Sequence, residues 1–242
     1  MKKLLLGLFL VSMMGYAADG KKALERVDTA STVMDEIMGA PDKGIPRDLL
    51  AKAECVAVIP SMKKGGFIFG GKYGVGVISC RVNIGKSWSA PSTVRIEGGS
   101  FGLQIGGAGT DVVLLVMNKR GAEKLMSSKF TLGGDASVAG GPVGRELTAQ
   151  TDAQMHAEIL SYSRSRGVFA GISLDGSTLR PDNDANKEIF GKEVAYKDIL
   201  MGRVPAPPGT KVFLTTLAKY AGLKSNAKAL IRKGATTHAR SS

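Results

Sequence analysis

Three lysines that flank glycine pairs could bind phosphate. Lys63 and Lys64 precede Gly65–Gly66, and Lys72 follows Gly70–Gly71. Ammonium groups beside backbone N–H groups recognise phosphate oxygens, and glycine leaves those N–H groups uncovered. The spacing therefore predicts contact with a phosphate headgroup at these turns. A solvated hairpin whose lysines protect a sheet edge from further pairing would use the same residues.

Three arginines in or beside expected strands are further candidates for this chemistry: Arg81, Arg95 and Arg145. An arginine in a strand can equally pair with a carboxylate, and Glu97 and Glu146 are available as partners. The sequence leaves both interpretations open.

Five aromatic residues lie among the glycines: Phe67, Phe69, Tyr73, Trp88 and Phe101. They could enter lipid or line an acyl pocket, and packing in the core is the alternative.

Two cysteines, Cys55 and Cys80, lie on neighbouring strand-like segments. In an oxidising compartment they could form a disulfide, and two buried free thiols are the alternative.

A nucleophile motif is present but incomplete. Gly98–Gly102 matches the G-x-S-x-G pattern at Ser100, but a glycine-rich strand follows where the motif requires a helix. The histidines are His156 and His238, and the second lies in a basic tail. A catalytic triad therefore lacks a well-placed imidazole, and we expect no enzyme activity.

Four side chains have the spacing of a calcium loop. Asp182, Asp184, Asn186 and Glu193 stand at its positions one, three, five and twelve. The sixth position, where the loop requires glycine, is Lys187. Capping of the next helix by Asp182 or Asp184 explains the same residues. We expect no cofactor and retain these four residues as the candidate calcium ligands.

The length and charge of the chain fit one basic domain. Of 242 residues, 43% are hydrophobic, which is sufficient for a sizeable core. The formal charge is +12, and no acidic residue lies between Ile199 and Ser242. Such a basic end attracts polyanions, among them phospholipid headgroups.

The N-terminus has the pattern of a cleaved secretory signal over residues 1–17. Lys2 and Lys3 precede an apolar stretch from Leu4 to Tyr16, and small residues follow at Ala17–Ala18. This stretch is too short to span a bilayer core of about 30 Å. We expect an exported protein, periplasmic or secreted and peripherally associated with a membrane, for which nucleic acid is not a partner.

Periodicity indicates the elements that position these residues. Residues 21–38 have apolar side chains at three- and four-residue steps, which predicts an amphipathic helix that packs on a sheet or lies on lipid. Further helices are expected at 46–52, 119–128, 183–191 and 210–223. Runs rich in Val, Ile, Phe and Thr, separated by glycine pairs, predict strands at 55–59, 66–70, 74–83, 92–97, 101–106, 111–117, 131–139, 142–150, 156–163 and 168–174.

Together these elements predict one α+β domain over residues 18–223. Its sheet is glycine-rich, strongly curved, mostly antiparallel and barrel-like, because glycine pairs mark bulges and corners. An N-terminal amphipathic helix and short C-terminal helices pack on it. A flexible basic tail is expected at 224–242.

Several long stretches, in one order, resemble the SYLF-domain lipid-binding family. They are AVIPSMKKGGFIFGGKYGVG from Ala57, WSAPS from Trp88, IEGGSFGLQIGG from Ile96, TDVVLLVMN from Thr110, LGGDASVAGGPVGR from Leu132, AEILSYSRSRG from Ala157 and FAGISLDG from Phe169. The resemblance covers about residues 21–200.

The resemblance implies non-catalytic binding of phospholipid. Eukaryotic members recognise phosphoinositides and act in membrane and actin remodelling, whereas bacterial members are exported envelope proteins. For an exported chain it implies binding of anionic phospholipid at an envelope membrane, with Lys21, Lys22 and Arg26 of the N-terminal helix at the lipid surface. A structural or scaffolding envelope protein, which holds a protein partner or a cell-wall polymer through its basic surface, is the alternative. The sequence does not indicate an oligomeric state.

Overall fold

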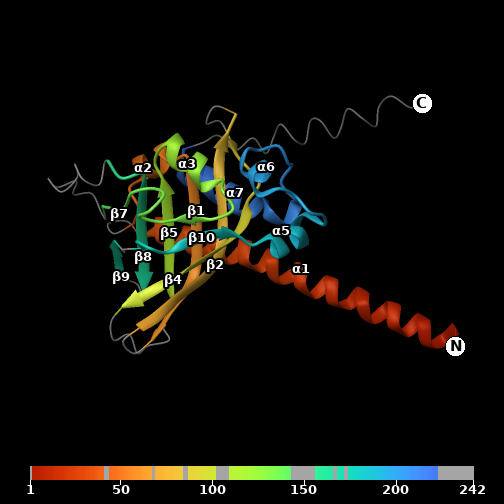
Figure 1. Cartoon of the computed structure of the whole chain (residues 1–242). Helices are drawn as coiled ribbons and strands as arrows, with labels where there is room; N and C mark the ends of the chain where they lie inside the picture. Colours follow the sequence, from red (N-terminus) through yellow and green to blue (C-terminus); the bar gives the residue numbers. More distant parts are fainter. Residues whose placement is uncertain are drawn as a thin grey trace, which may run out of the picture.

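A computed structural model describes residues 2–40, 44–66, 69–83, 87–101, 109–142, 156–165, 168–171 and 174–222. The first elements are α1 (Lys2–Gly39), α2 (Arg47–Lys52), β1 (Cys55–Gly66), β2 (Phe69–Val82), β3 (Ser87–Trp88), β4 (Ser92–Phe101), β5 (Thr110–Val116), α3 (Lys119–Leu125), β6 (Phe130–Thr131) and β7 (Val138–Gly140). They are followed by β8 (Ile159–Ser165), β9 (Val168–Gly171), β10 (Thr178–Pro181), α5 (Asn183–Phe190), α6 (Tyr196–Leu200), the 3-10 helix η1 (Pro208–Thr210) and α7 (Lys211–Tyr220). The expected α+β class is confirmed (Figure 1).

The strands form one curled sheet. Their order is β6-β10-β4-β2-β1-β5-β8-β7, with β3 attached to β2 and β9 to β8. All the pairings are antiparallel except that of β7 with β8, so the sheet is mixed. Residues 130–140, which we call the strap, join the β6 edge to the β7 edge directly. The strong curvature predicted from the glycine pattern is confirmed.

An apolar core lies on each face of the sheet. Successive residues of β1 alternate between the two: Val56 and Val58 belong to the core covered by α1 and α7, and Ala57 and Ile59 to the core covered by the strap and α3. We call these the helix-side core and the strap-side core. Because both faces are covered, the central strands are continuously apolar instead of alternating with polar residues.

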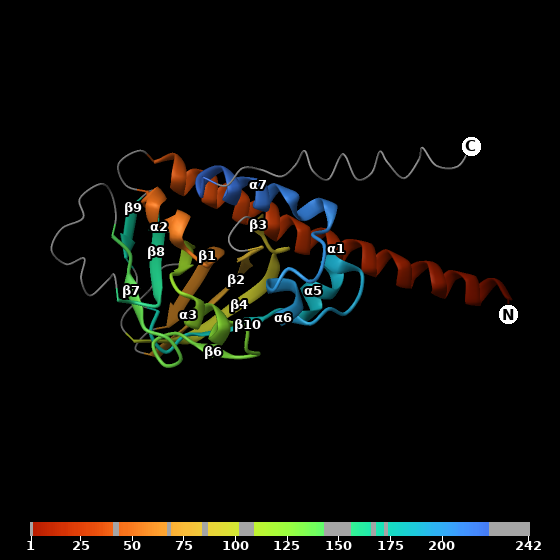
Figure 2. The ribbon, with the colours of Figure 1, turned by 90° about the horizontal axis from the view of Figure 1, so that it is seen from above.

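Helix α1 packs along the sheet with one apolar stripe. Its fully or nearly fully buried side chains follow the predicted steps of three and four residues: Ala23, Val27, Ala30, Met34 and Ile37. Over residues 23–38 the helix therefore packs on the sheet, which is one of the two alternatives that the sequence leaves open. Helix α7 lies beside it (Figure 2), and the Oγ of Ser31 is 2.8 Å from the Oγ1 of Thr216.

The N-terminal half of α1 extends away from the rest of the molecule (Figures 1 and 2). Among the helices of the described residues, none combines the length and apolar content that a membrane span requires.

Some of the predicted strand boundaries are wrong. The expected strand at 66–70 is divided, because Gly66 ends β1 and Gly70 lies opposite it in β2, with residues 67–68 outside the described part of the chain. The expected strand at 131–139 is two short strands, β6 and β7, with a turn between them. Glycine retains its backbone donor and acceptor, so glycine pairs at 65–66 and 70–71 continue the ladder instead of ending it. The expected strands at 101–106 and 142–150 lie largely outside the described residues.

A bulge in β1 bends the strand before the lysines. The register shifts between Ile59 and Met62, and Ser61 has φ 47°. The bend brings β1 so close to β2 that a Cβ on Gly76 would lie 2.0 Å from the carbonyl oxygen of Val58. Glycine is therefore required at position 76.

Cys55 and Cys80 form a disulfide between β1 and β2. The two residues are directly opposite each other in the ladder, and both are buried. The sequence leaves open a disulfide or two buried free thiols, and the structure contains the disulfide.

Candidate functional site

The hairpin of β1 and β2 places two lysines side by side. Lys64 lies directly opposite Lys72, and directly opposite residues in a ladder share one face of the sheet. Both side chains are partly exposed, on the face of the strap-side core. Partial burial, and then the positive charge of Lys72, lower the pKa of Lys64 below its ordinary value. The arrangement concentrates positive charge on one small area.

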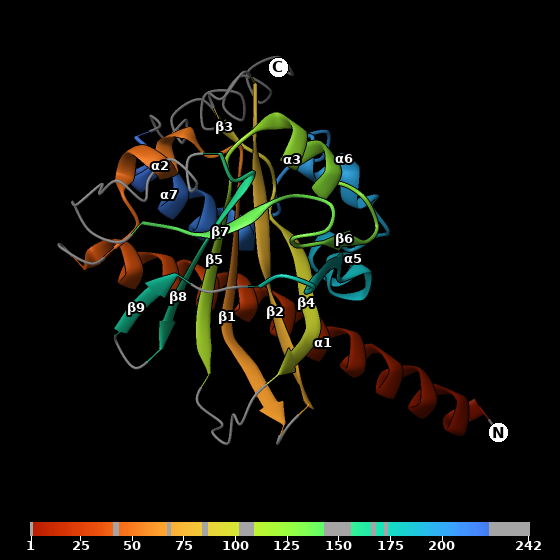
Figure 3. The same cartoon turned by 60° about the vertical axis from the view of Figure 1, so that its left-hand side comes forward.

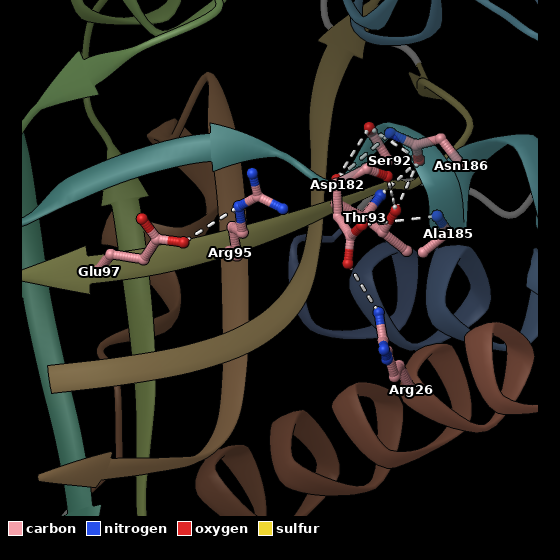
Figure 4. A network of polar contacts seen from close by, with 8 residues as sticks. All are labelled: Arg26, Ser92, Thr93, Arg95, Glu97, Asp182, Ala185 and Asn186. Carbon is pink, nitrogen blue, oxygen red and sulfur yellow. Dashed lines mark hydrogen bonds and ion pairs between the residues drawn. The ribbon is translucent and has the colours of Figure 1, made fainter.

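The opposite face of the hairpin carries a lysine, a tyrosine and a glutamate instead of a pair of lysines. Lys63 lies opposite Tyr73, and Tyr73 lies opposite Glu97 of β4. Tyr73 is one of the most exposed large apolar side chains of the described residues, at 52%. Glu97 forms an ion pair with Arg95 at 3.1 Å (Figure 4). The candidate Arg95 is therefore engaged with a carboxylate, one of the two alternatives that the sequence leaves open.

Glycines expose the backbone beside the lysines. Gly65, Gly71 and Gly99 are neighbours across β1, β2 and β4. A Cβ at Gly65 or Gly99 would have no heavy atom within 4 Å. The sheet surface in this row is therefore clear of side chains, while the backbone groups of these glycines belong to the ladder. Figure 3 shows these ends of β1, β2 and β4 at one end of the sheet, opposite α2 and α3.

Arg81 has a structural role that sequence reasoning did not find. Its Nε donates to the carbonyl oxygen of Ala53 at 2.6 Å, and its Nη2 donates to that of Ala51 at 2.8 Å. The guanidinium also lies over the ring of Trp88, 4.5 Å from the centroid. These contacts satisfy the carbonyls at the end of α2. Arg81 lies in β2 nine residues beyond Lys72, so the structure does not bring it to the lysine pair.

The remaining candidate cations are not brought to the hairpin. Lys21 and Lys22 are exposed on α1, and Arg145 lies outside the described residues. Of the aromatic candidates, Trp88 is buried, and Phe67 lies outside the described residues. Phe69 and Phe101 are opposite each other in the ladder of β2 and β4.

Two of the four candidate calcium ligands, Asp182 and Asn186, hold α5 against its neighbours (Figure 4). Asp182 caps α5 and receives a hydrogen bond from Arg26 of α1 at 2.9 Å. The Oδ1 of Asn186 accepts from the backbone N–H of Thr93 at 2.7 Å, and Glu193 pairs with Lys187. Asp184 lies in the first turn of α5. Within the described ranges, no three His, Cys, Asp or Glu side chains are grouped so that they could hold a metal ion.

Ser100 lies in a strand and not at a strand-to-helix turn. It is paired with Gly70 inside the β2–β4 ladder. The geometry of a hydrolase nucleophile, which needs a sharp turn into a helix, is not formed there.

The sequence is similar to known proteins over most of its length. Residues 97–220 match the family model Ysc84, described as Las17-binding protein actin regulator. The chain belongs to the Ysc84 family. The SYLF-domain resemblance is thereby confirmed.

Curated relatives of the Ysc84 family come from yeast and mammals. LAS seventeen-binding protein 3 of Saccharomyces cerevisiae (strain ATCC 204508 / S288c) is 38% identical over 191 residues, which cover 77% of this chain and 41% of the relative. SH3 domain-containing YSC84-like protein 1 of Rattus norvegicus is 39% identical over 168 residues, 69% of this chain and 49% of the relative. The human protein of the same name is 38% identical, with 69% and 48% covered. The chain thus spans less than half the length of these relatives.

Proposed function

We propose that this Ysc84-family chain binds anionic phospholipid surfaces through the end of the β1–β2 hairpin and catalyses no reaction. The observation that carries the proposal is the direct opposition of Lys64 and Lys72. Two ammonium groups on one face of the hairpin can both donate to the oxygens of one phosphate. Partial burial is the larger cause of the lowered pKa of Lys64, and the positive charge of Lys72 adds to it.

The neighbouring residues supply further contacts with a membrane. Lys63 is exposed on the other face of the hairpin, and each lysine near an anionic surface contributes about 1 kcal/mol. Tyr73 is an amphipathic side chain that suits the interface between headgroups and hydrocarbon. Gly65, Gly71 and Gly99 carry no side chains, so a headgroup can approach this face of the hairpin beside the lysines.

Vesicle sedimentation tests the proposal with the chain from residue 18 onward. Vesicles of phosphatidylcholine alone are compared with vesicles that also contain phosphatidylserine. Lys64→Gln/Lys72→Gln is expected to weaken binding to the anionic vesicles by about 2 kcal/mol, or roughly 30-fold. The matched control is Lys52→Gln/Lys119→Gln, which makes the same change in net charge at the other end of the sheet. Equal losses from the two double variants, or equal binding to both vesicle types, would contradict the proposal.

A protein partner is the second candidate, because relatives carry the description Las17-binding. A scaffolding role of this kind uses the same basic surface to hold a protein or a cell-wall polymer. It predicts that cross-linking at the hairpin captures a protein or wall fragments, and that binding to vesicles shows no preference for anionic lipid.

We also propose that residues 1–17 are removed on export and that the protein works outside the cytoplasm. The apolar stretch lies in the half of α1 that extends away from the molecule, so its removal leaves the packed stripe from Ala23 onward intact (Figure 1). Intact mass measurement of the protein from fractionated cells tests this. A start at Ala18 in an extracytoplasmic fraction is expected, and an uncleaved cytoplasmic form would contradict the proposal.

A further inference from the structure

The connection between α6 and η1 is rich in proline. Prolines stand at positions 205, 207 and 208. Proline fixes its own φ near −65°, and a residue that precedes proline is restricted to extended backbone. Pro207 has φ −58° and ψ 148°, the conformation of a polyproline II helix. Ala206 and Pro207, which each precede a proline, are therefore extended as in polyproline II, and Pro208 begins the 3-10 helix η1.

One edge of this stretch faces solvent. A polyproline II helix has three residues per turn, so Pro205 and Pro208 lie on the same edge. Both are exposed, whereas Ala206 and Pro207 between them are partly buried. In the described part of the chain, the carbonyls of Pro205 and Ala206 accept no backbone hydrogen bond. The ring edge and the free carbonyls are the features that polyproline-binding grooves contact.

Both ends of the stretch are anchored. On the α6 side, Gly202 has φ 71° and packs so closely on Val82 that a Cβ would lie 2.8 Å from its Cγ1. On the η1 side, a Cβ on Gly209 would lie 2.9 Å from the Cδ2 of Leu24 in α1. A segment held in its binding conformation loses little conformational entropy when a partner docks.

The flanks add apolar and basic side chains. Met201 is 41% exposed and Val212 is 42% exposed, so two of the three most exposed large apolar side chains of the described residues flank the stretch. Arg203 and Lys211 are exposed as well. Because no acidic residue follows Asp198 in the sequence, the charge on this side of the molecule favours an acidic partner surface.

We infer that Pro205–Pro208 is a docking site for a protein domain of the SH3 kind, with a groove lined by aromatic side chains and bordered by acidic residues. The exposed prolines contact the aromatic rings of that groove, and Lys211 contacts its acidic border, since Arg203 already pairs with Asp198 at 2.7 Å. This interaction is separate from the proposed membrane contact, since it uses no residue of the β1–β2 hairpin. A connection that merely joins α6 to α7 needs neither the exposed edge nor the exposed flanks.

The test titrates the full chain, labelled with a fluorophore, against a panel of purified SH3 domains that includes the one from rat SH3 domain-containing YSC84-like protein 1. Binding by at least one domain is expected, and Pro205→Ala/Pro208→Ala should weaken it by about tenfold or more. Pro46→Ala, which changes a partly exposed proline at α2, is the matched control and should bind as the unmodified chain does.

The single variant Pro205→Ala separates loss of docking from loss of folding, because residue 205 is exposed and its ring supports no helix. It should weaken the same domain while leaving the thermal melt and the binding to anionic vesicles unchanged. The inference is overturned if no domain of the panel binds, or if the proline variants bind as tightly as Pro46→Ala.

Discussion

Asp111 of β5 accepts a hydrogen bond from the backbone N–H of Ser61 at 2.9 Å and thereby joins β5 to the bulge of β1. Its other carboxylate oxygen accepts from the Nη2 of Arg164 at 2.9 Å. A serine at φ 47° is held in the left-handed region by its surroundings, and Asp111 is a direct contact that does so. Because the bulge turns the end of β1 that carries Lys63 and Lys64, Asp111 orients the proposed lipid-binding hairpin.

Replacement of Asp111 is expected to destabilise the fold. Asp111→Ala removes the acceptor of the exposed Ser61 N–H and one of the carboxylate partners of the partly buried Arg164, and should lower the free energy of unfolding by about 1–2 kcal/mol. Urea denaturation measures the change. Asp28→Ala, an exposed position on α1, is the control and should stay within about 0.5 kcal/mol. Similar losses in the two variants would show that Asp111 does not hold the bulge.

The disulfide is expected to stabilise the fold by restricting the unfolded chain. The bond joins residues 25 apart in sequence, for which the chain-entropy model gives roughly 3 kcal/mol. Cys55→Ala/Cys80→Ala should lose about that amount in urea denaturation. The unmodified chain under a strong reductant is the control, and it should show nearly the same loss because it lacks only the bond. No difference between oxidised and reduced chains would contradict this account.

The sequence is sufficient to predict features that depend on local pattern. The three- and four-residue spacing from Ala23 to Ile37 predicts the helix and its buried stripe, and burial of those residues confirms it. Runs rich in Val, Ile, Phe and Thr, separated by glycine pairs, predict the central strands. Lys63, Lys64 and Lys72 are identified by their glycine neighbours, without knowledge of the register.

Features that depend on register or on distant contacts are not predictable in this way. The opposition of Lys64 and Lys72 follows from the bulge at Ile59–Met62, and a shift by one residue would move the lysines to different faces. Arg81 caps α2 because the disulfide-linked strands bring it there. Asn186 bonds to Thr93, 93 residues away. Only the folded chain shows such pairs.

Asn186 is expected to be among the most sensitive polar residues. It is 2% exposed, and its Oδ1 accepts from the backbone N–H of Thr93 at 2.7 Å and from its Oγ1 at 2.8 Å. Asn186→Ala leaves a buried donor without an acceptor and should lower the free energy of unfolding by about 2–3 kcal/mol. Asn183→Ala, at the exposed start of the same helix, serves as the control for chemical denaturation. If Asn186→Ala proved as stable as this control, the network would contribute little.

Stability is expected to depend on Asp35 in acid. Burial acts against ionisation of this carboxylate, but hydrogen bonds from Tyr220, Lys219 and Thr216 outweigh it, so the pKa of Asp35 lies below its ordinary value. A lowered pKa in the folded state adds stability above the ordinary pKa of about 4, and this stability is lost as the pH falls through the folded value.

The measurement for Asp35 compares the free energy of unfolding of the unmodified chain and of Asp35→Asn between pH 7 and pH 3. The unmodified chain should be the more stable at pH 7, and the difference should shrink towards pH 3. Because Asp35 is 43% exposed, added salt should reduce the difference as well. A difference that stays constant with pH would mean that Asp35 is not the titrating group.

The last prediction concerns Tyr73 and separates membrane contact from simple charge attraction. If the ring enters the interface, Tyr73→Ser should weaken binding to anionic vesicles by about 1 kcal/mol, roughly fivefold, with no change in net charge. Tyr73→Trp should keep or strengthen binding, since tryptophan suits the same interface. Val212→Ser, at an apolar side chain of similar exposure on α7, is the control. An equal loss from Val212→Ser would place the membrane contact at α7, and unchanged binding by Tyr73→Ser would leave only the lysines to account for it.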